Sequence, residues 1–221
     1  MKPIRLQLVG RMRSGKDTIC ELIQELYPQV KRIAYADALK VISKDTMLLA
    51  YEVLKSGGID ISYDKFLKVI NTKEYMRGFY INFGTGIVRN QISATAWYDA
   101  TVTLNLSAFT RGDYVITDTR FQNELEDSAF SFDTKTIIVS CKKNVLWQRF
   151  HKDNPDTTHE EYKTFYNNES EQLYDRTLSM GNYHYEIVNN HDLEHLKLEI
   201  QKVMTLLYPG RSTSFKLGEI T

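Results

Sequence analysis

The 221-residue chain has little cysteine and no net charge. Its two cysteines, Cys20 and Cys141, lie far apart and lack CxxC or Cys/His spacing, which argues against a disulfide framework or a zinc site. Lys plus Arg number 28 and Asp plus Glu number 28, so no overall positive field attracts polyanions. We therefore expect reduced thiols and no stable nucleic-acid binding.

Long apolar runs are also absent. No segment approaches the roughly 18–20 apolar residues that span a bilayer, and the opening MKPIRLQLVG has no signal-peptide core. We expect no membrane partner and a cytoplasmic location. The amino-acid composition is that of an ordinary globular protein, with 42% apolar and 25% charged residues. This length suits one α/β domain with an inserted subdomain, or two small domains.

Short apolar or β-branched segments alternate with amphipathic ones. In the first amphipathic segment Ile19, Leu22, Ile23 and Leu26 share one helical face, and the helix should end near Pro28. Alternating strands and helices predict a three-layer α/β fold with a five-stranded, mostly parallel sheet. The five predicted strands are Pro3–Val9, Arg32–Ala36, Tyr114–Thr117, Thr136–Cys141 and Tyr185–Val188.

The long gap between the second and third predicted strands indicates an insertion, because one crossover helix needs far fewer residues. Helical patterns at Ala38–Leu54 and Tyr63–Ile70 predict that this insertion is helical. We expect a core of residues 1–37 and 111–207, an insertion at 38–110, and a polar helical lid at about 152–180. Residues 208–221 should form a flexible tail.

The most informative motif follows the first strand and opens the first amphipathic helix. It reads Gly10-Arg11-Met12-Arg13-Ser14-Gly15-Lys16-Asp17-Thr18 and fits GxxxxGK. Its glycines let backbone N–H groups turn inward, and the helix N-terminus adds positive charge, so the loop can hold di- or triphosphate oxygens. Lys16 would supply a mobile charge to these oxygens, and Arg13 a second one.

Asp17 stands where the usual loop has a magnesium-binding Ser or Thr, and Thr18 follows it. Thr18 would contact Mg²⁺ if the turn is shifted by one residue. Asp17 would act through water, or would only favour the helix N-terminus. A third candidate for the metal is Asp118, which closes the third strand at the sheet edge where open α/β folds bind ligands.

Arg120 follows Asp118 and would face the same crevice. In the insertion, Arg77 and Arg89 flank Gly84-Thr85-Gly86, which interrupts a helical pattern, and they would bind a second phosphate group. Trp97 offers a stacking face for a base or packs in the core. The remaining candidates are Asp37, as a helix cap or an acceptor-site acid, and Arg149, as a lid arginine or part of a solvated face.

Together these motifs resemble the phage-type deoxynucleoside monophosphate kinases of the P-loop kinase superfamily. The resemblance runs over about residues 4–207. It rests on Gly10–Thr18, Asp37-Ala-Leu-Lys40, Arg77 with Phe83-Gly84-Thr85, Asp118-Thr-Arg120-Phe-Gln-Asn-Glu124, and Asn189-Asn190. Asn168-Glu169-Ser170-Glu171 is similar to the family's His-x-Ser-Glu element but lacks the histidine.

The resemblance implies ATP as donor, Mg²⁺, and a small-molecule deoxynucleoside monophosphate as acceptor. Lys16 and Arg13, with Gly10, Ser14, Gly15, Asp17 and Thr18, would hold the donor phosphates, and Arg149 would close from the lid. Asp118 would organise metal or acceptor. The protein could form a homodimer, and a phage-encoded member of this family would act in the cytoplasm of the host cell. The acceptor would contact Asp37, Lys40, Arg77, Thr85, Arg89, Trp97 and Arg120.

Two other classes of function stay open. One is a related P-loop kinase whose acceptor is a nucleoside or a modified base in DNA. The other is a nucleotide-binding regulator that transfers no phosphate. Arginines outside the phosphate loop favour an enzyme, because a pure switch does not require a second phosphate pocket.

Overall fold

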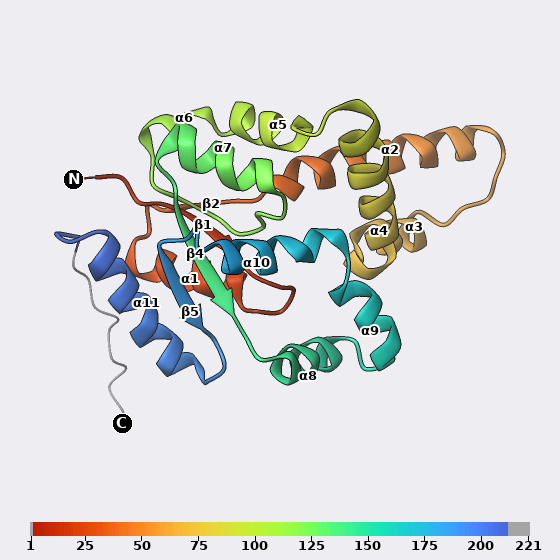
Figure 1. The fold of residues 1–221 in the computed structure, drawn as a ribbon. Helices are drawn as coiled ribbons and strands as arrows, with labels where there is room; N and C mark the ends of the chain where they lie inside the picture. The colour runs from red at the N-terminus through yellow and green to blue at the C-terminus, as the bar shows by residue number, and fades with distance from the viewer. Residues whose placement is uncertain (1, 212–221) are drawn as a thin grey trace, which may run out of the picture. The chain divides into compact units, whose positions relative to one another are not determined.

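The structure is a computed structural model that describes residues 2–211. The side chains of Lys73, Glu74, Arg77, Glu169 and Ser170 lie outside this description. Contacts within the chain divide it into two units (Figure 1). The core unit is formed by Met1–Ala34 and Asn105–Thr221, and the helical unit is Tyr35–Leu104.

The core unit is built on one five-stranded sheet. Every strand pairs in parallel with its neighbours, and the order across the sheet is β2-β3-β1-β4-β5. The fold is therefore α/β with the parallel sheet predicted from the strand–helix alternation. The strands are β1 (Arg5–Val9), β2 (Lys31–Ile33), β3 (Tyr114–Ile116), β4 (Lys135–Ser140) and β5 (Tyr185–Val188).

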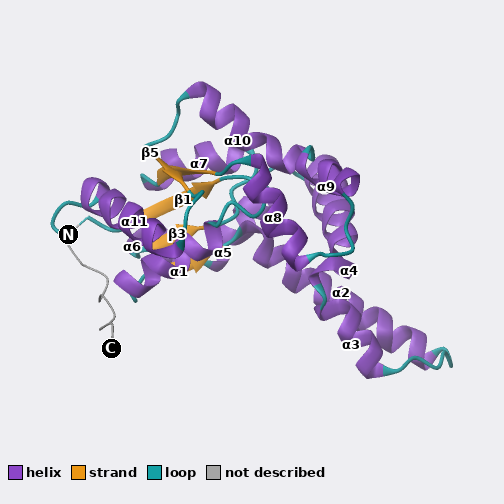
Figure 2. Cartoon of the chain, turned by 90° about the horizontal axis from the view of Figure 1, so that it is seen from below, coloured by secondary structure: helices purple, strands orange, loops and turns teal. Residues whose placement is uncertain are grey.

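Helices cover both faces of this sheet (Figure 2). On one face α1 and α11 pack over β1, β4 and β5, and the predicted apolar stripe of α1 is buried there. On the other face α7 and α10 contact the sheet. The core-unit helices are α1 (Lys16–Leu26), α6 (Leu106–Arg111), α7 (Gln122–Phe132), α8 (Lys143–Asp153), α9 (His159–Tyr166), α10 (Glu169–Met180) and α11 (Leu193–Leu207).

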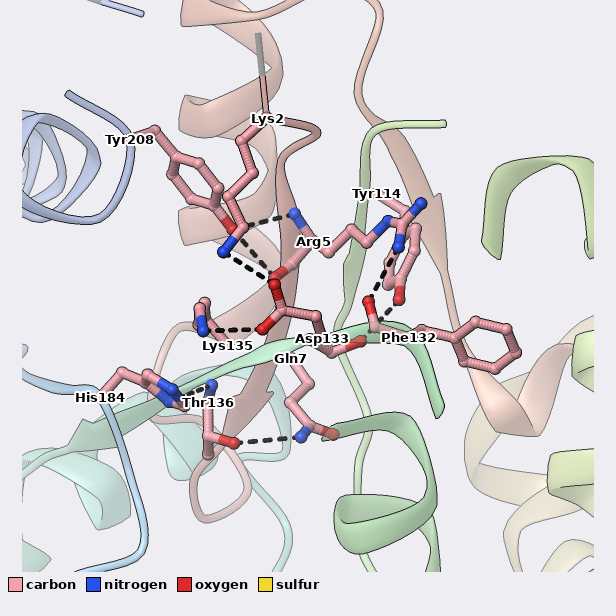
Figure 3. Close-up of polar contacts among 11 residues, drawn as sticks. Lys2, Arg5, Gln7, Tyr114, Phe132, Asp133, Lys135, Thr136, His184 and Tyr208 are labelled. Carbon is pink, nitrogen blue, oxygen red and sulfur yellow. Dashed lines mark hydrogen bonds and ion pairs between the residues drawn. The ribbon is translucent and has the colours of Figure 1, made fainter. Parts of the chain in front are cut away.

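Polar contacts join the strands near the edge where they begin, opposite the carboxyl ends (Figure 3). The buried Gln7 amide donates to the Thr136 hydroxyl at 3.0 Å, and the backbone N–H of Thr136 donates to His184 Nδ1 at 3.1 Å. Asp133 pairs with Lys2 and Lys135, which lowers its pKa to about 2. These contacts stabilise the sheet near the amino ends of its strands. The phosphate loop lies at the opposite edge, where the strands end.

The predicted segments for all five strands contain strands, but one prediction ran too far. The expected strand Arg32–Ala36 ends at Ile33, because Tyr35 already begins a helix. The predicted tail begins at residue 208, and its first residues make contacts with the core unit. The buried Tyr208 hydroxyl bonds the N–H and the carbonyl of Arg5, and Arg211 pairs with Asp113 at 2.6 Å. Residues 212–221 of that tail lie outside the described residues.

The helical unit consists of helices only. Tyr51 of α2 packs its ring against Tyr63 and Phe66 of α3, at centroid distances of 5.1 and 4.9 Å. No helix in residues 2–211 is long and apolar enough to cross a membrane. The elements are α2 (Tyr35–Ser56), α3 (Tyr63–Asn71), α4 (Lys73–Phe79), the π-helix η1 (Tyr80–Ile92) and α5 (Ala96–Leu104).

The expected interruption at Gly84-Thr85-Gly86 is a change of helical winding instead. These residues lie inside η1, which continues directly from α4. A β-carbon at Gly84 would lie 2.5 Å from Leu39 Cδ2, so the glycine permits η1 to approach α2. Gly84, which signals a break in the sequence, therefore permits a close helix–helix contact here.

Candidate functional site

The phosphate loop Gly10–Thr18 runs from the end of β1 into the first turn of α1, at the carboxyl edge of the sheet. Arg13 and Gly15 have positive φ angles of 66° and 98°, and Ser14 N–H closes a turn onto the Arg11 carbonyl at 3.1 Å. Gly10 is required for packing, since a β-carbon there would lie 2.7 Å from the Val139 carbonyl oxygen. Positive φ angles of this kind occur where backbone N–H groups form an anion-binding nest.

Lys16 is the first residue of α1, and its ammonium group folds back over the loop. Lys16 Nζ donates to the carbonyls of Gly10 at 2.7 Å and Arg11 at 3.0 Å. Burial lowers the pKa of Lys16 to about 8, although the Glu171 carboxylate acts in the opposite direction. A buried cation held over N–H groups and a helix N-terminus is suited to phosphate oxygens.

The residues present fit a polyphosphate. The Ser14 hydroxyl is buried and has no hydrogen-bond partner in the described part of the chain. A buried hydroxyl of this kind ordinarily finds a partner, and a phosphate oxygen would supply one. The loop thus combines an unsatisfied hydroxyl, a cation and a glycine-permitted backbone.

Two charged residues of the loop make contacts that sequence reasoning did not anticipate. The Arg13 guanidinium pairs with Asp153 at the end of α8, at 2.6 Å. The Asp17 carboxylate is 74% exposed and lies 3.8 Å from the Arg32 guanidinium. Arg13 is therefore linked to the end of α8, the helix that precedes the predicted lid. Asp17 is a solvent-exposed acid beside β2.

Asp118 and Arg120 follow β3 and lie close enough to Lys16 for their charges to change its pKa. The buried Glu124 of α7 accepts hydrogen bonds from the backbone N–H of Arg120 at 2.8 Å and of Phe121 at 3.1 Å. This carboxylate satisfies N–H groups at the start of α7 and fixes the backbone of Arg120. The motif Asp118–Glu124 thus orients an acid and an arginine beside the phosphate loop.

Glu171 was missed as a site residue, although the Asn168–Glu171 element contained the signal for it. Its carboxylate is only 5% exposed. One oxygen accepts from the backbone N–H of Met12 at 2.6 Å, and the other lies 2.9 Å from Arg120 Nη1. Burial lowers the pKa of Arg120, but the Glu171 and Asp118 carboxylates more than offset this, so its pKa is raised.

Arg149 and Asn189 hold the other side of the loop. Arg149 extends from α8, and its guanidinium contacts the Arg13 carbonyl and the Asn189 side-chain oxygen, each at 3.4 Å. The Asn189 amide donates to the Ser14 carbonyl at 2.8 Å. The structure therefore brings Arg149 to the phosphate loop. Asn189, which sequence reasoning used only as a family marker, positions both groups.

Arg11 also escaped prediction, because it looks like any variable loop position. Its buried guanidinium donates to the Tyr166 carbonyl at 2.9 Å, pairs with Asp175, and lies 3.8 Å from the centre of the Tyr166 ring. These contacts anchor α9 and α10 to the phosphate loop. The predicted lid segment is helical, and it is linked to the loop by charged groups.

The remaining candidates belong to the helical unit. Asp37 and Lys40 form an ion pair at 2.8 Å on the first turns of α2. Trp97 Nε1 donates to the Gly84 carbonyl at 2.9 Å, so the indole is part of the packing of η1. Arg89 donates to the Ala94 carbonyl at 2.6 Å, Thr85 lies within η1, and the side chain of Arg77 lies outside the described residues.

No group of three or more His, Cys, Asp or Glu side chains within the described residues could hold a metal ion. This does not conflict with the predicted Mg²⁺, because phosphate-bound magnesium commonly takes one or two protein ligands and keeps several waters. Of the three candidates, Asp118 is the one whose charge raises the pKa of both Lys16 and Arg120, although Asp17 acts more strongly on Lys16. Both cysteines are free thiols, as expected.

Comparison with known proteins identifies the fold. No protein-family model matches the chain, and no curated protein sequence matches it. Among solved structures, dephospho-CoA kinase from Campylobacter jejuni has a TM-score of 0.51 and 16% identity over 91% of this chain and 96% of that chain. Shikimate kinase from Acinetobacter baumannii, in complex with shikimate, has a TM-score of 0.50 and 15% identity over 93% of each chain.

A third similar structure is protein TT1252 from Thermus thermophilus, with a TM-score of 0.50 and 14% identity over 94% of this chain and 99% of that chain. At these identities the likeness concerns the fold. The chain has the fold of the P-loop kinases, as the phosphate-loop motif predicted, and its parallel sheet and surrounding helices are those of this fold.

Proposed function

We propose that this protein is a deoxynucleoside monophosphate kinase. It would transfer the γ-phosphoryl group of ATP to a deoxynucleoside monophosphate, yielding ADP and the deoxynucleoside diphosphate. The observation that carries the proposal is the cluster of Lys16, Asp118 and Arg120 at the carboxyl edge of β1 and β3. The phosphate loop accounts for a donor nucleotide, and Arg120 outside that loop supplies a cation for a second phosphate.

The chemistry requires little covalent help from the protein. Phosphoryl transfer is promoted mainly by placing donor and acceptor in line and by stabilising the charge on the transferred group. Lys16, the loop N–H groups and the Ser14 hydroxyl would hold the donor phosphates, and Arg149 would stabilise the charge that develops on them. When bound, Mg²⁺ would neutralise phosphate charge, with Asp118, Thr18 or Asp17 as its candidate protein contacts.

The acceptor assignment is supported by the family resemblance. In that family pattern, the acceptor monophosphate would be held by Arg120 together with Arg77 and Arg89. Asp37, Lys40, Thr85 and Trp97 would contact the rest of the acceptor. Kinases with a similar fold use other acceptors. The similar structures include a shikimate kinase and a dephospho-CoA kinase, which are named for theirs.

The decisive experiment offers purified protein Mg-ATP together with each candidate acceptor separately. The panel contains the four common deoxynucleoside monophosphates, their ribonucleotide counterparts, a deoxynucleoside, shikimate, dephospho-CoA and duplex DNA with modified bases. Separation of the products should reveal at least one deoxynucleoside diphosphate. Phosphorylation of another acceptor without any monophosphate turnover would reject this acceptor while keeping a kinase. ATP binding without any transfer would favour a regulator.

Variants connect the activity to the residues. Lys16→Ala should reduce kcat/KM by about 100-fold or more, because it removes a cation that stabilises transferring phosphate charge. Arg120→Ala should raise the acceptor KM more than the ATP KM. Arg176→Ala is the matched control, since Arg176 is an exposed arginine of α10 whose side chain bonds Gln172. Equal losses in Arg120→Ala and Arg176→Ala would contradict the assigned role.

A further inference from the structure

The phosphate loop is contacted by a carboxylate from the chain itself. Glu171, in the first turns of α10, uses one oxygen to accept from the Met12 N–H and the other to pair with Arg120. Met12 lies inside the GxxxxGK loop, and Arg120 is the cation proposed for the acceptor phosphate. One buried carboxylate therefore engages two groups that a phosphate would use.

We propose that Glu171 is an internal competitor for phosphate and that nucleotide binding displaces it from the loop. A carboxylate and a phosphate present the same kind of anionic oxygen to N–H donors. Both cannot occupy these donors together, because bringing a second anion beside a buried one is unfavourable. The inference rests on the proposed function only in that the loop binds phosphate.

The surroundings of Glu171 make the contact a substantial one. Its carboxylate is 5% exposed, and charge-assisted hydrogen bonds are shorter and stronger than neutral ones. The Arg120 side chain is partly buried but 42% exposed, so another anion can reach its guanidinium from solvent. Glu171 and a bound phosphate therefore compete for the same hydrogen-bond donors. Displacing Glu171 costs the free energy of its two charge-assisted hydrogen bonds.

A second link explains how α10 stays attached when Glu171 leaves. Arg11 binds the Tyr166 carbonyl and the Asp175 carboxylate, and neither of these contacts uses a phosphate-binding group. The segment from α9 to α10 thus has one tether that phosphate does not disturb and one that it replaces. Displacement of Glu171 therefore removes one contact between α10 and the loop and leaves the Arg11 contacts in place.

The test measures binding in the full chain, without turnover. Calorimetric titration with pyrophosphate and with Mg-ATP compares the wild type with Glu171→Gln, which keeps the side-chain shape and removes its charge. The variant should bind both ligands about tenfold more tightly, the effect of losing one charge-assisted contact to a competing anion. Glu160→Gln is the matched control, because it removes the same charge from the exposed face of α9 and should leave affinity unchanged.

Thermal unfolding provides an independent readout. Without ligand, Glu171→Gln should unfold at a lower temperature than the wild type, and saturating pyrophosphate should raise its unfolding temperature by more than it raises that of the wild type. Glu171→Asp, which stays charged but is one methylene shorter, should show the same direction of change. Glu171→Asp replaces Glu171→Gln in both measurements if Glu171→Gln does not fold.

Three results would overturn the proposal. Unchanged or weaker ligand binding in both Glu171 variants would mean that Glu171 only positions Arg120, while the kinase assignment would stand. Equal tightening in Glu160→Gln would mean a general charge effect. Absence of pyrophosphate and Mg-ATP binding in every variant and in the wild type would reject both the competition and the proposed function.

Discussion

The side-chain amide of Asn189 donates a hydrogen bond of 2.8 Å to the backbone carbonyl of Ser14, joining the end of β5 to the phosphate loop. Asn189 is 6% exposed, and its amide oxygen faces Arg149. Asn189 thus connects the loop to the arginine that we propose to stabilise the transferring group.

Replacing Asn189 tests this relationship. Asn189→Ala should lower the free energy of unfolding by about 1–3 kcal/mol, because it leaves the Ser14 carbonyl without its side-chain donor. It should also weaken ATP binding, because the loop and Arg149 lose their common partner. Urea unfolding and calorimetric titration measure the two effects. Asn190→Ala is the control, since the adjacent Asn190 bonds the backbone of Lys142 instead; similar ATP weakening there would contradict the prediction.

Gly15 carries a second prediction. Its φ of 98° strains any other residue, and a β-carbon there would lie 2.2 Å from Asn189 Nδ2. Gly15→Ala should cost at least the roughly 1–3 kcal/mol of backbone strain, with the clash in addition, and should abolish ATP binding. Gly58→Ala is the matched control, because Gly58 has a φ of 83° and nothing near the added β-carbon.

The two glycine variants separate strain from contact in urea unfolding. Gly58→Ala should lose only the strain energy and should still bind ATP. If Gly15→Ala is no less stable than Gly58→Ala and still binds ATP, the close approach of Asn189 to the loop is not important for either property.

The charge of Lys16 makes ATP binding depend on pH. Burial lowers the pKa of Lys16 to about 8, so the free protein loses this proton as the pH rises through 8. Bound phosphate favours the protonated form and raises that pKa. Binding should therefore take up about 0.9 proton at pH 9 and about 0.1 at pH 7 at this residue, and affinity should fall about tenfold between pH 7 and pH 9.

Titrations in two buffers of different protonation enthalpy measure this proton uptake directly. At pH 9 the phosphates of ATP are fully ionised, so they contribute no proton of their own. Equal uptake at pH 7 and pH 9 would show that Lys16 is already fully protonated at the higher pH. It would therefore contradict the lowered pKa.

His184 predicts a loss of stability in mild acid. Burial lowers the pKa of His184, and its neutral Nδ1 accepts the Thr136 N–H (Figure 3). Because the unfolded chain binds this proton more readily, the stabilisation is complete above the ordinary pKa of about 6.5 and is lost as the pH falls toward the folded value. Urea unfolding at pH 7.5 and 5.5 should show this loss.

His184→Gln keeps an acceptor for Thr136 that does not titrate, so its stability should change less over this pH range than that of the wild type. His195→Gln removes an exposed histidine of α11 and should behave like the wild type. A wild-type profile that both variants share would mean that other groups cause the acid effect.

Local sequence patterns predicted much of the fold. The GxxxxGK spacing, the apolar face of α1 and the short β-branched segments depend on neighbours within a few residues, so they are readable without tertiary information. The prediction ran too far at Ala34–Ala36, because the same residues can extend a strand or begin a helix. Gly84 of η1 was misinterpreted for a similar reason, since a glycine permits either a break in a helix or a close contact, here with Leu39.

The amino-acid sequence by itself determined that a strand, a phosphate-binding loop and an amphipathic helix follow one another, and that Asp118 and Arg120 follow the third strand. Only the tertiary structure decided that Glu171 and Asn189 contact the loop, and that Arg11 of the loop contacts Tyr166 of α9. Glu171 and Asn189 are more than 150 residues away from it along the chain, and the parallel order of β1, β3, β4 and β5 brings their segments to one edge. Such contacts arise from the packing of distant elements, which no local spacing encodes.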